Sequence, residues 1–171
     1  DRSKTSYFDI KMKTFILVCL LIISFASYAK EKIDIIVIKK SERILYAVKN
    51  DKIIKKYNIA LGRNPKGHKK KEGDKKTPEG YYFVDGKNAK SNFFLSLHTS
   101  YPNFHDKRVA ARNNVNPGEH IAIHGLPPIN LLAQYLYNGA DWTDGCIALN
   151  NSDMQELWDL TEEGTQILIK P

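Results

Sequence analysis

The alternation of hydrophobic and polar positions predicts a chain that is mostly β. Short β-branched runs bounded by Gly, Asn and Asp recur along it, as is typical of strands joined by tight turns. Two of them flank Asn50-Asp51 and predict a hairpin that turns there. The strands are expected within Ile33–Ile38, Arg43–Val48, Lys52–Ile59, Gly80–Val84, Asn92–His98, Ile121–His124 and Thr165–Lys170.

Two segments have the apolar spacing of helices. Ile129–Tyr137 is one, with a stop at Asn138-Gly139. Ser152–Leu160 is the other, with Asn150 or Asn151 as its cap and acidic residues in its first turn. The expected fold is therefore mainly β with short flanking helices.

Two further segments lack any apolar period and are predicted to be loops. Arg63–Lys76 contains seven Lys or Arg residues and two glycines, which favours a mobile, solvated loop. Contact with an anionic envelope polymer is the alternative. Pro102–Gly118 carries several asparagines, and a loop of this length inside a domain is often functional.

Residues 1–29 are predicted to be an export signal. Lys11 and Lys13 precede the apolar run Phe15–Phe25, and Ser27-Tyr-Ala29 offers small residues for cleavage. A membrane-spanning helix needs about 20 apolar residues, so this run is short for an uncleaved anchor, which is the alternative. Because Met12 suits the start of such a leader, residues 1–11 are an upstream extension or an artefact. Cleavage leaves residues 30–171 as one domain.

Net charge limits the partners. The 171 residues carry a formal net charge of +7, which suits nucleic acid, an anionic membrane surface or an anionic polymer. The sequence contains no zinc-finger spacing, RNA-binding aromatic signature or Walker loop, so nucleic acid is not expected. Membrane contact is expected only through an uncleaved leader.

Cys146 is the candidate nucleophile. Cys19 lies in the leader, so the mature chain keeps one cysteine, which is either a reactive thiol or a buried structural residue. Gly145 permits a strained turn beside it. His124 ends a strand-like run, with eighteen residues between it and Thr143, and is the candidate base. His120 would share a face with His124, but the ligand spacing of a zinc site is absent, so no metal is expected.

Four motifs occur in the order found in the L,D-transpeptidase catalytic domain, also called the YkuD domain, and the chain resembles that family. The resemblance is greatest to its compact Gram-negative, YafK-like members, and it implies a β-sandwich. The motifs are Thr77-Pro-Glu-Gly-Tyr-Tyr82, Ser100-Tyr-Pro-Asn103, Ile123-His-Gly-Leu-Pro127 and Asp141-Trp-Thr-Asp-Gly-Cys-Ile-Ala148.

The resemblance implies a mechanism. His124 takes the proton of Cys146, and the thiolate attacks a tetrapeptide stem of peptidoglycan, which releases D-alanine and leaves a thioester. Backbone N–H groups of Gly145 and Cys146 would hold the oxyanion, and a carbonyl at Thr143 would orient the histidine. No cofactor is required. We expect a periplasmic monomer.

The acceptor stays open at this point. A stem amine would give a crosslink, a lysine of an envelope lipoprotein would give protein attachment, and water would give an L,D-carboxypeptidase. An amidase that releases a bound lipoprotein is a related possibility. A non-enzymatic envelope-binding domain is the remaining alternative.

Substrate contacts are predicted at positions around the motifs and in the long loop. Asp144 stands where the family commonly has histidine, and Ala148 where it often has arginine. Arg108 and Arg112 could hold a substrate carboxylate, with an ordinary surface role as the alternative. His98 and His105 are expected to be polar partners or surface residues. The predicted substrate-binding residues are Gly125, Trp142, Asp144, Arg108 and Arg112.

Overall fold

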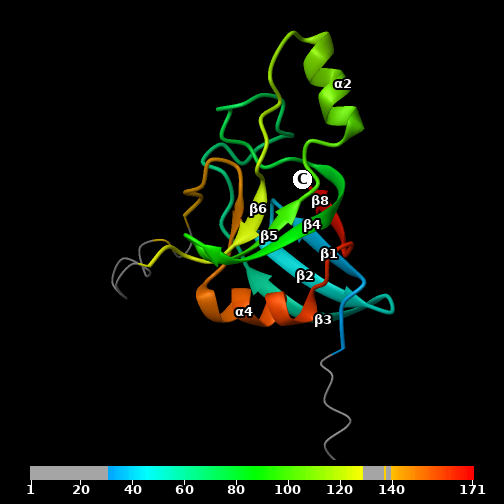
Figure 1. Cartoon of the computed structure of the whole chain (residues 1–171), viewed down its shortest axis with the longest axis vertical. Coiled ribbons are helices and arrows are strands. Elements are labelled where there is room, and N and C mark those ends of the chain that lie inside the picture. The colour runs from blue at the N-terminus through cyan, green and yellow to red at the C-terminus, as the bar shows by residue number, and fades with distance from the viewer. Residues whose placement is uncertain (1–30, 129–136, 138–139) are drawn as a thin grey trace, which may run out of the picture. The chain divides into compact units, whose positions relative to one another are not determined.

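Eight strands form a continuous sheet in the computed structural model, which describes residues 31–128, 137 and 140–171. The strand order is β3-β2-β1-β8-β4-β5-β6-β7 (Figure 1). Within these described residues, two helices accompany the sheet, α2 (Phe104–Arg112) and α4 (Asn151–Leu160). The strands are β1 (Ile35–Lys39), β2 (Ile44–Lys49), β3 (Lys52–Asn58), β4 (Gly80–Ser91), β5 (Phe94–Thr99), β6 (Ala122–His124), β7 (Ile147–Ala148) and β8 (Gln166–Lys170).

The long strand β4 belongs to both halves of the sheet. Its first residues, Gly80 to Phe83, pair with β8, and from Val84 onward it pairs with β5. The register shifts between Val84 and Gly86, as at a β-bulge, which bends a strand and increases its twist. The first half contains β3, β2, β1 and β8, and the second contains β5, β6 and β7.

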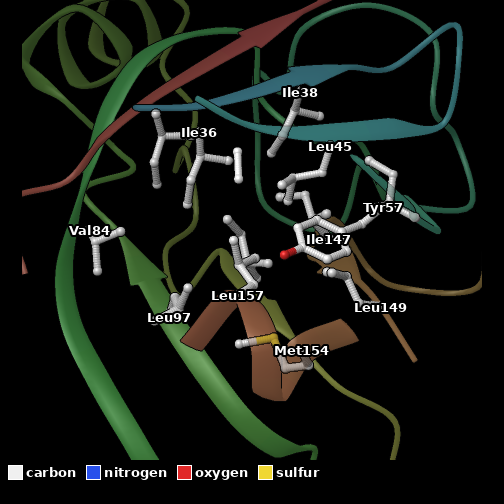
Figure 2. Packing of buried hydrophobic residues seen from close by; sticks show 14 of the residues in the cluster. Ile36, Ile38, Leu45, Tyr57, Val84, Leu97, Ile147, Leu149, Met154 and Leu157 are labelled. Carbon is white, nitrogen blue, oxygen red and sulfur yellow. The ribbon is translucent and has the colours of Figure 1, made fainter. Parts of the chain in front are cut away.

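Side chains from both halves meet in one hydrophobic core. Ile36, Ile38 and Leu45 come from the first half, and Leu97 and Ile147 come from the second; all five are 0% exposed (Figure 2). Burial of this kind stabilises the fold by about 25 cal/mol per Å² of apolar surface. The core therefore fixes the two halves of the sheet as one domain, as the β-sandwich prediction required.

Helix α4 covers the second half of the sheet. Met154, Leu157 and Leu160 are buried on its inner face, and Met154 and Leu157 pack into the core (Figure 2). Asn150 is its N-cap, because its side chain accepts a hydrogen bond from the Asp153 N–H at 2.8 Å. The helix predicted near Asn150 is thus confirmed.

The predicted strands are confirmed, with β4 extending further than expected. Asn50 and Asp51 both have positive φ, which matches the tight turn predicted for the hairpin. Most of the helix predicted at Ile129–Tyr137 lies outside the described residues, as does the leader at residues 1–29. In the described part of the chain, neither helix has the length and hydrophobicity to span a membrane.

The loop predicted over Pro102–Gly118 is wrong for half of its length, since α2 occupies Phe104–Arg112. Asn103 caps this helix with a capping box: its side chain accepts from Asp106 N–H, and the Asp106 carboxylate accepts from Asn103 N–H. The only buried residues of α2 are Asp106 and Ala110, so the helix has no apolar stripe. The Asn103-x-x-Asp106 pattern was the available signal.

The basic segment Arg63–Lys76 contains no strand or helix, as predicted, but its interior is extensively bonded. The Asp74 carboxylate accepts from three backbone N–H groups and from Lys69 Nζ at 2.9 Å, and Lys69 is only 4% exposed. The expectation of a merely solvated loop is therefore wrong. Its backbone also bonds to a distant part of the chain, since the Arg63 N–H donates to the Thr143 carbonyl at 3.0 Å.

Replacing Asn150 with Ala should destabilise the protein by about 1 kcal/mol, because the first turn of α4 loses its cap. Urea unfolding followed by circular dichroism measures this change. Asn150→Ser keeps a capping oxygen and should recover most of the stability. Equal stability of Asn150→Ala and the parent protein would show that the cap contributes nothing.

Candidate active site

The parallel pairing of β6 with β7 sets the site. Ile123 of β6 pairs with Ile147 of β7 and with Leu97 of β5. All three side chains are 0% exposed, so these paired residues point into the core. Side chains alternate along a strand. Ala122 and His124 therefore face the other way, and Cys146, which directly precedes β7, is level with Ala122.

These outward residues line a groove of about 550 Å³. His124 and Cys146 both line it, one diagonal step apart on neighbouring segments. Ser96 and His98 of β5 continue the same face, because they pair with His124 and Ala122. The groove thus brings the predicted base and nucleophile onto one surface.

His124 is oriented by the next residue in the chain. Its Nδ1 lies 2.7 Å from the carbonyl oxygen of Gly125. A carbonyl can only accept, so Nδ1 carries the hydrogen and the Nε2 lone pair is available as a base. The prediction that Thr143 supplies this carbonyl is wrong, since the Thr143 carbonyl accepts from Arg63 N–H at 3.0 Å.

Aromatic rings surround His124. The ring centroid of Phe93 lies 4.6 Å from that of His124, and the ring centroid of Trp142 lies 5.7 Å away. Burial lowers the pKa of His124 below its ordinary value of 6.5, and the hydrogen bond to Gly125 opposes the shift in part. The imidazole is therefore neutral at neutral pH, as a general base must be.

Cys146 is partly buried, and its Sγ donates to the His120 carbonyl at 3.6 Å. Burial raises the pKa of the Cys146 thiol above its ordinary value of 9.0. The Asp144 carboxylate raises this pKa further, whereas a hydrogen bond from the Ala122 backbone and the Lys69 ammonium lower it. The pKa shifts of His124 and Cys146 both favour the neutral forms, so the resting pair is a thiol and a neutral imidazole.

Thr143 braces the turn that leads to the nucleophile. Its hydroxyl donates to the Cys146 carbonyl at 2.7 Å and accepts from the Gly145 N–H at 3.1 Å. The Gly145 N–H is therefore occupied, which contradicts its predicted role as an oxyanion donor. Thr143 positions the Cys146 backbone.

Glycine is required at position 145. Its φ is +135°, a conformation that side chains with a Cβ rarely adopt, and a Cβ there would lie 2.7 Å from the Lys76 carbonyl oxygen. The prediction of a turn that needs glycine is confirmed. The close approach comes from Lys76 of the basic segment Arg63–Lys76, which packs directly against the turn before Cys146.

The predicted substrate-binding residues fall into two groups. Trp142 and Asp144 line the groove, and Asp144 pairs with Arg63 Nη1 at 3.0 Å. Gly125 does not line the groove and instead holds His124. Arg108 and Arg112 are exposed on α2 and do not line the groove either.

Several residues that line the groove were not predicted from the sequence. His98, expected at the surface, is exposed but lines the groove, as do His120, Lys90 and Arg63. The alternation of Ser96 and His98 with buried Leu95 and Leu97 was the available signal for β5. Across the described ranges, no group of three or more His, Cys, Asp or Glu residues is arranged to hold a metal ion.

The L,D-transpeptidase catalytic domain (YkuD) matches residues 33–169 of this sequence. The chain therefore belongs to that family. A search of curated proteins finds no match.

Solved structures share the fold. The helical cell shape determining protein Pgp2 from Campylobacter jejuni is 26% identical, with a TM-score of 0.60, over 83% of this chain and 49% of that chain. Bd1075 from Bdellovibrio bacteriovorus is 26% identical, with a TM-score of 0.54, over 84% and 49%. An L,D-transpeptidase from Xylanimonas cellulosilytica is 17% identical, with a TM-score of 0.52, over 82% and 61%. The chain thus spans about half the length of the first two.

Alkylation of Cys146 by iodoacetamide should accelerate about tenfold per pH unit between about pH 6 and pH 9. Only the thiolate reacts, and the pKa of Cys146 is raised above 9.0, so the thiolate fraction keeps rising over this range. Mass spectrometry of the intact protein gives the rate at each pH. A plateau that begins near neutral pH would instead demonstrate a preformed thiolate and imidazolium pair.

Replacing Thr143 with Val should destabilise the protein by about 2 kcal/mol, because the Gly145 N–H and the Cys146 carbonyl both lose their partner. Thr143→Ser retains the hydroxyl and should remain close to the parent protein. Chemical denaturation of the three proteins makes the comparison. If Thr143→Val were as stable as Thr143→Ser, the hydroxyl would not brace the turn.

Proposed function

We propose that the protein is a peptidoglycan L,D-transpeptidase with Cys146 as nucleophile and His124 as base. The observation that carries this proposal is the shared groove face of the two side chains, with His124 held by Gly125 so that Nε2 is available. Membership of the family supports peptidoglycan stems as the substrate class.

In the first half of the reaction, His124 Nε2 takes the thiol proton and Sγ attacks the carbonyl carbon of the bond between diaminopimelate and D-alanine. The imidazolium then returns the proton to the leaving amine. D-alanine departs, and the stem remains bound to Cys146 as a thioester. No metal or organic cofactor takes part in these steps.

In the second half, an amine attacks the thioester and His124 takes its proton. Sγ leaves as the thiolate and is protonated again. A stem amine gives a crosslink, and a lysine of an envelope lipoprotein gives an attached protein. Water in place of the amine makes the same site an L,D-carboxypeptidase, so the choice of acceptor decides between transferase and hydrolase.

The place of action follows from the substrate. Peptidoglycan lies outside the cytoplasm, and residues 1–29 would direct export to the periplasm. The assignment to the compact YafK-like members stays a prediction, and so do monomeric behaviour and the lipoprotein acceptor.

Incubation of residues 30–171 with purified disaccharide tetrapeptides tests the proposal, with products identified by mass spectrometry. We expect crosslinked dimers with loss of D-alanine, and none with Cys146→Ala. Cys146→Ala changes only the nucleophile, so its groove should still bind the peptide. The rate should persist down to pH values below about 6.5, because the pKa of the base is lowered from that value.

Tripeptides without dimers would assign the carboxypeptidase. Complete absence of turnover by the parent protein on free tetrapeptides and on stems that carry a lipoprotein peptide would overturn the proposal and support the non-enzymatic binding domain.

A further inference from the structure

A strongly basic surface adjoins the groove. The segment Arg63–Lys76 has a net charge of +5, and α2 adds Lys107, Arg108 and Arg112. The two elements lie together: the Glu72 N–H donates to the Asn116 carbonyl at 2.8 Å, and Lys70, Lys71 and Lys76 share a cleft with Val109, Asn113 and Val115, which belong to α2 and the residues that follow it. We call the segment Arg63–Lys76 and the three α2 cations the basic face.

Buried hydrogen bonds and ion pairs fix the backbone of the basic face. Lys40 Nζ donates to the Gly67 carbonyl at 2.7 Å, and His68 Nε2 lies 3.2 Å from the buried carboxylate of Asp106 in α2. Asp74 and Lys69 bond the interior of the segment. The backbone is therefore fixed while the outer side chains project into solvent.

The outer cations lack carboxylate partners within the described residues. Lys70, Lys71 and Lys75 are exposed, and the structure shows no ion pair for them or for the three α2 cations. Several cations on the first half of the sheet are instead paired, as in Arg43 with Asp141 and Lys55 with Glu156, whereas Lys52 and Lys56 of β3 are exposed and show no ion pair in the described part of the chain. Unpaired charges of one sign create a field that attracts an anionic partner.

Two observations favour a polymer that also enters the groove, and not a lipid surface, as the anionic partner. Arg63 is the first residue of the basic face and also lines the groove, so the face continues the site. The segment Arg63–Lys76 contains no large apolar side chain that could insert into a lipid surface, and α2 adds only Phe104 in its first turn.

We propose that the basic face binds the carboxylate-bearing peptide stems of intact peptidoglycan, next to the stem that occupies the groove. This inference rests on the proposed function for its choice of polymer. One stem enters the groove, and neighbouring stems meet Lys70, Lys71, Lys75 and the α2 cations. The face supplies affinity for the polymer that a single soluble stem does not need.

The test compares two double variants that change the net charge equally. Lys70→Glu/Lys71→Glu alters the basic face. Lys52→Glu/Lys56→Glu alters exposed lysines of β3, which lies at the opposite end of the view from α2 (Figure 1). All proteins carry Cys146→Ala, so that binding is measured without turnover, and thermal melting confirms that each is folded.

Co-sedimentation with purified sacculi measures the binding. We expect the basic-face variant to bind on the order of tenfold more weakly than the parent, with little change for the β3 variant. Binding should fall as salt rises and should be lost on sacculi whose carboxyl groups are blocked as amides. The proposal would be overturned if the basic-face variant bound sacculi as well as the parent does, or if both variants lost the same amount of binding.

Binding to vesicles of phosphatidylglycerol tests the alternative that the basic face binds a lipid surface. Stronger binding to vesicles than to sacculi, lost in the basic-face variant, would overturn the proposal in favour of a lipid surface.

Turnover separates this proposal from the proposed function. With Cys146 restored, Lys70→Glu/Lys71→Glu should convert soluble tetrapeptide at the parent rate and show a raised KM on sacculi alone. Failure of the parent on soluble tetrapeptide would count against the enzyme, whereas unchanged KM on sacculi would count against the basic face.

Discussion

The parallel register of β6 and β7 is the constraint on which the site depends. Core burial of Leu97, Ile123 and Ile147 fixes this register, because a slip of one residue would turn every side chain to the opposite face. The His124 side chain would then point into the core and would no longer line the groove. The positions of His124 and Cys146 thus follow from hydrophobic packing on the other side of the same strands.

Burial also sets the electrostatics of the site. The aromatic neighbours that hold His124 in place remove water from it, which lowers its pKa, and the partial burial of Cys146 raises the pKa of the thiol. Both shifts favour the neutral forms, so the resting thiol and imidazole are uncharged. The hydrogen bond from His124 Nδ1 to the Gly125 carbonyl leaves Nε2 as the nitrogen with a free lone pair.

Local sequence predicted much of this. The hairpin at Asn50-Asp51, the cap at Asn150 and the glycine-dependent turn at Gly145 all rest on nearest-neighbour chemistry. Helix α2 was missed because it buries only Asp106 and Ala110 and so has no apolar period. The partner of His124 was misassigned because its geometry depends on the bend of the chain after β6, which no spacing encodes.

In the basic segment Arg63–Lys76, the backbone makes the structural contacts, whereas most of the charge lies on side chains that face solvent. Its backbone carbonyls at Lys75 and Lys76 fill the space that side chains at Gly62 and Gly145 would need, so the path of this segment requires glycine at both positions. The outer lysine side chains contribute nothing to that contact. Their charge is therefore free to serve a partner, while Lys69, whose ammonium is buried against Asp74, serves the fold. Among the lysines of this segment, Lys69 thus bonds the interior, whereas the side chains of Lys70, Lys71 and Lys75 face solvent.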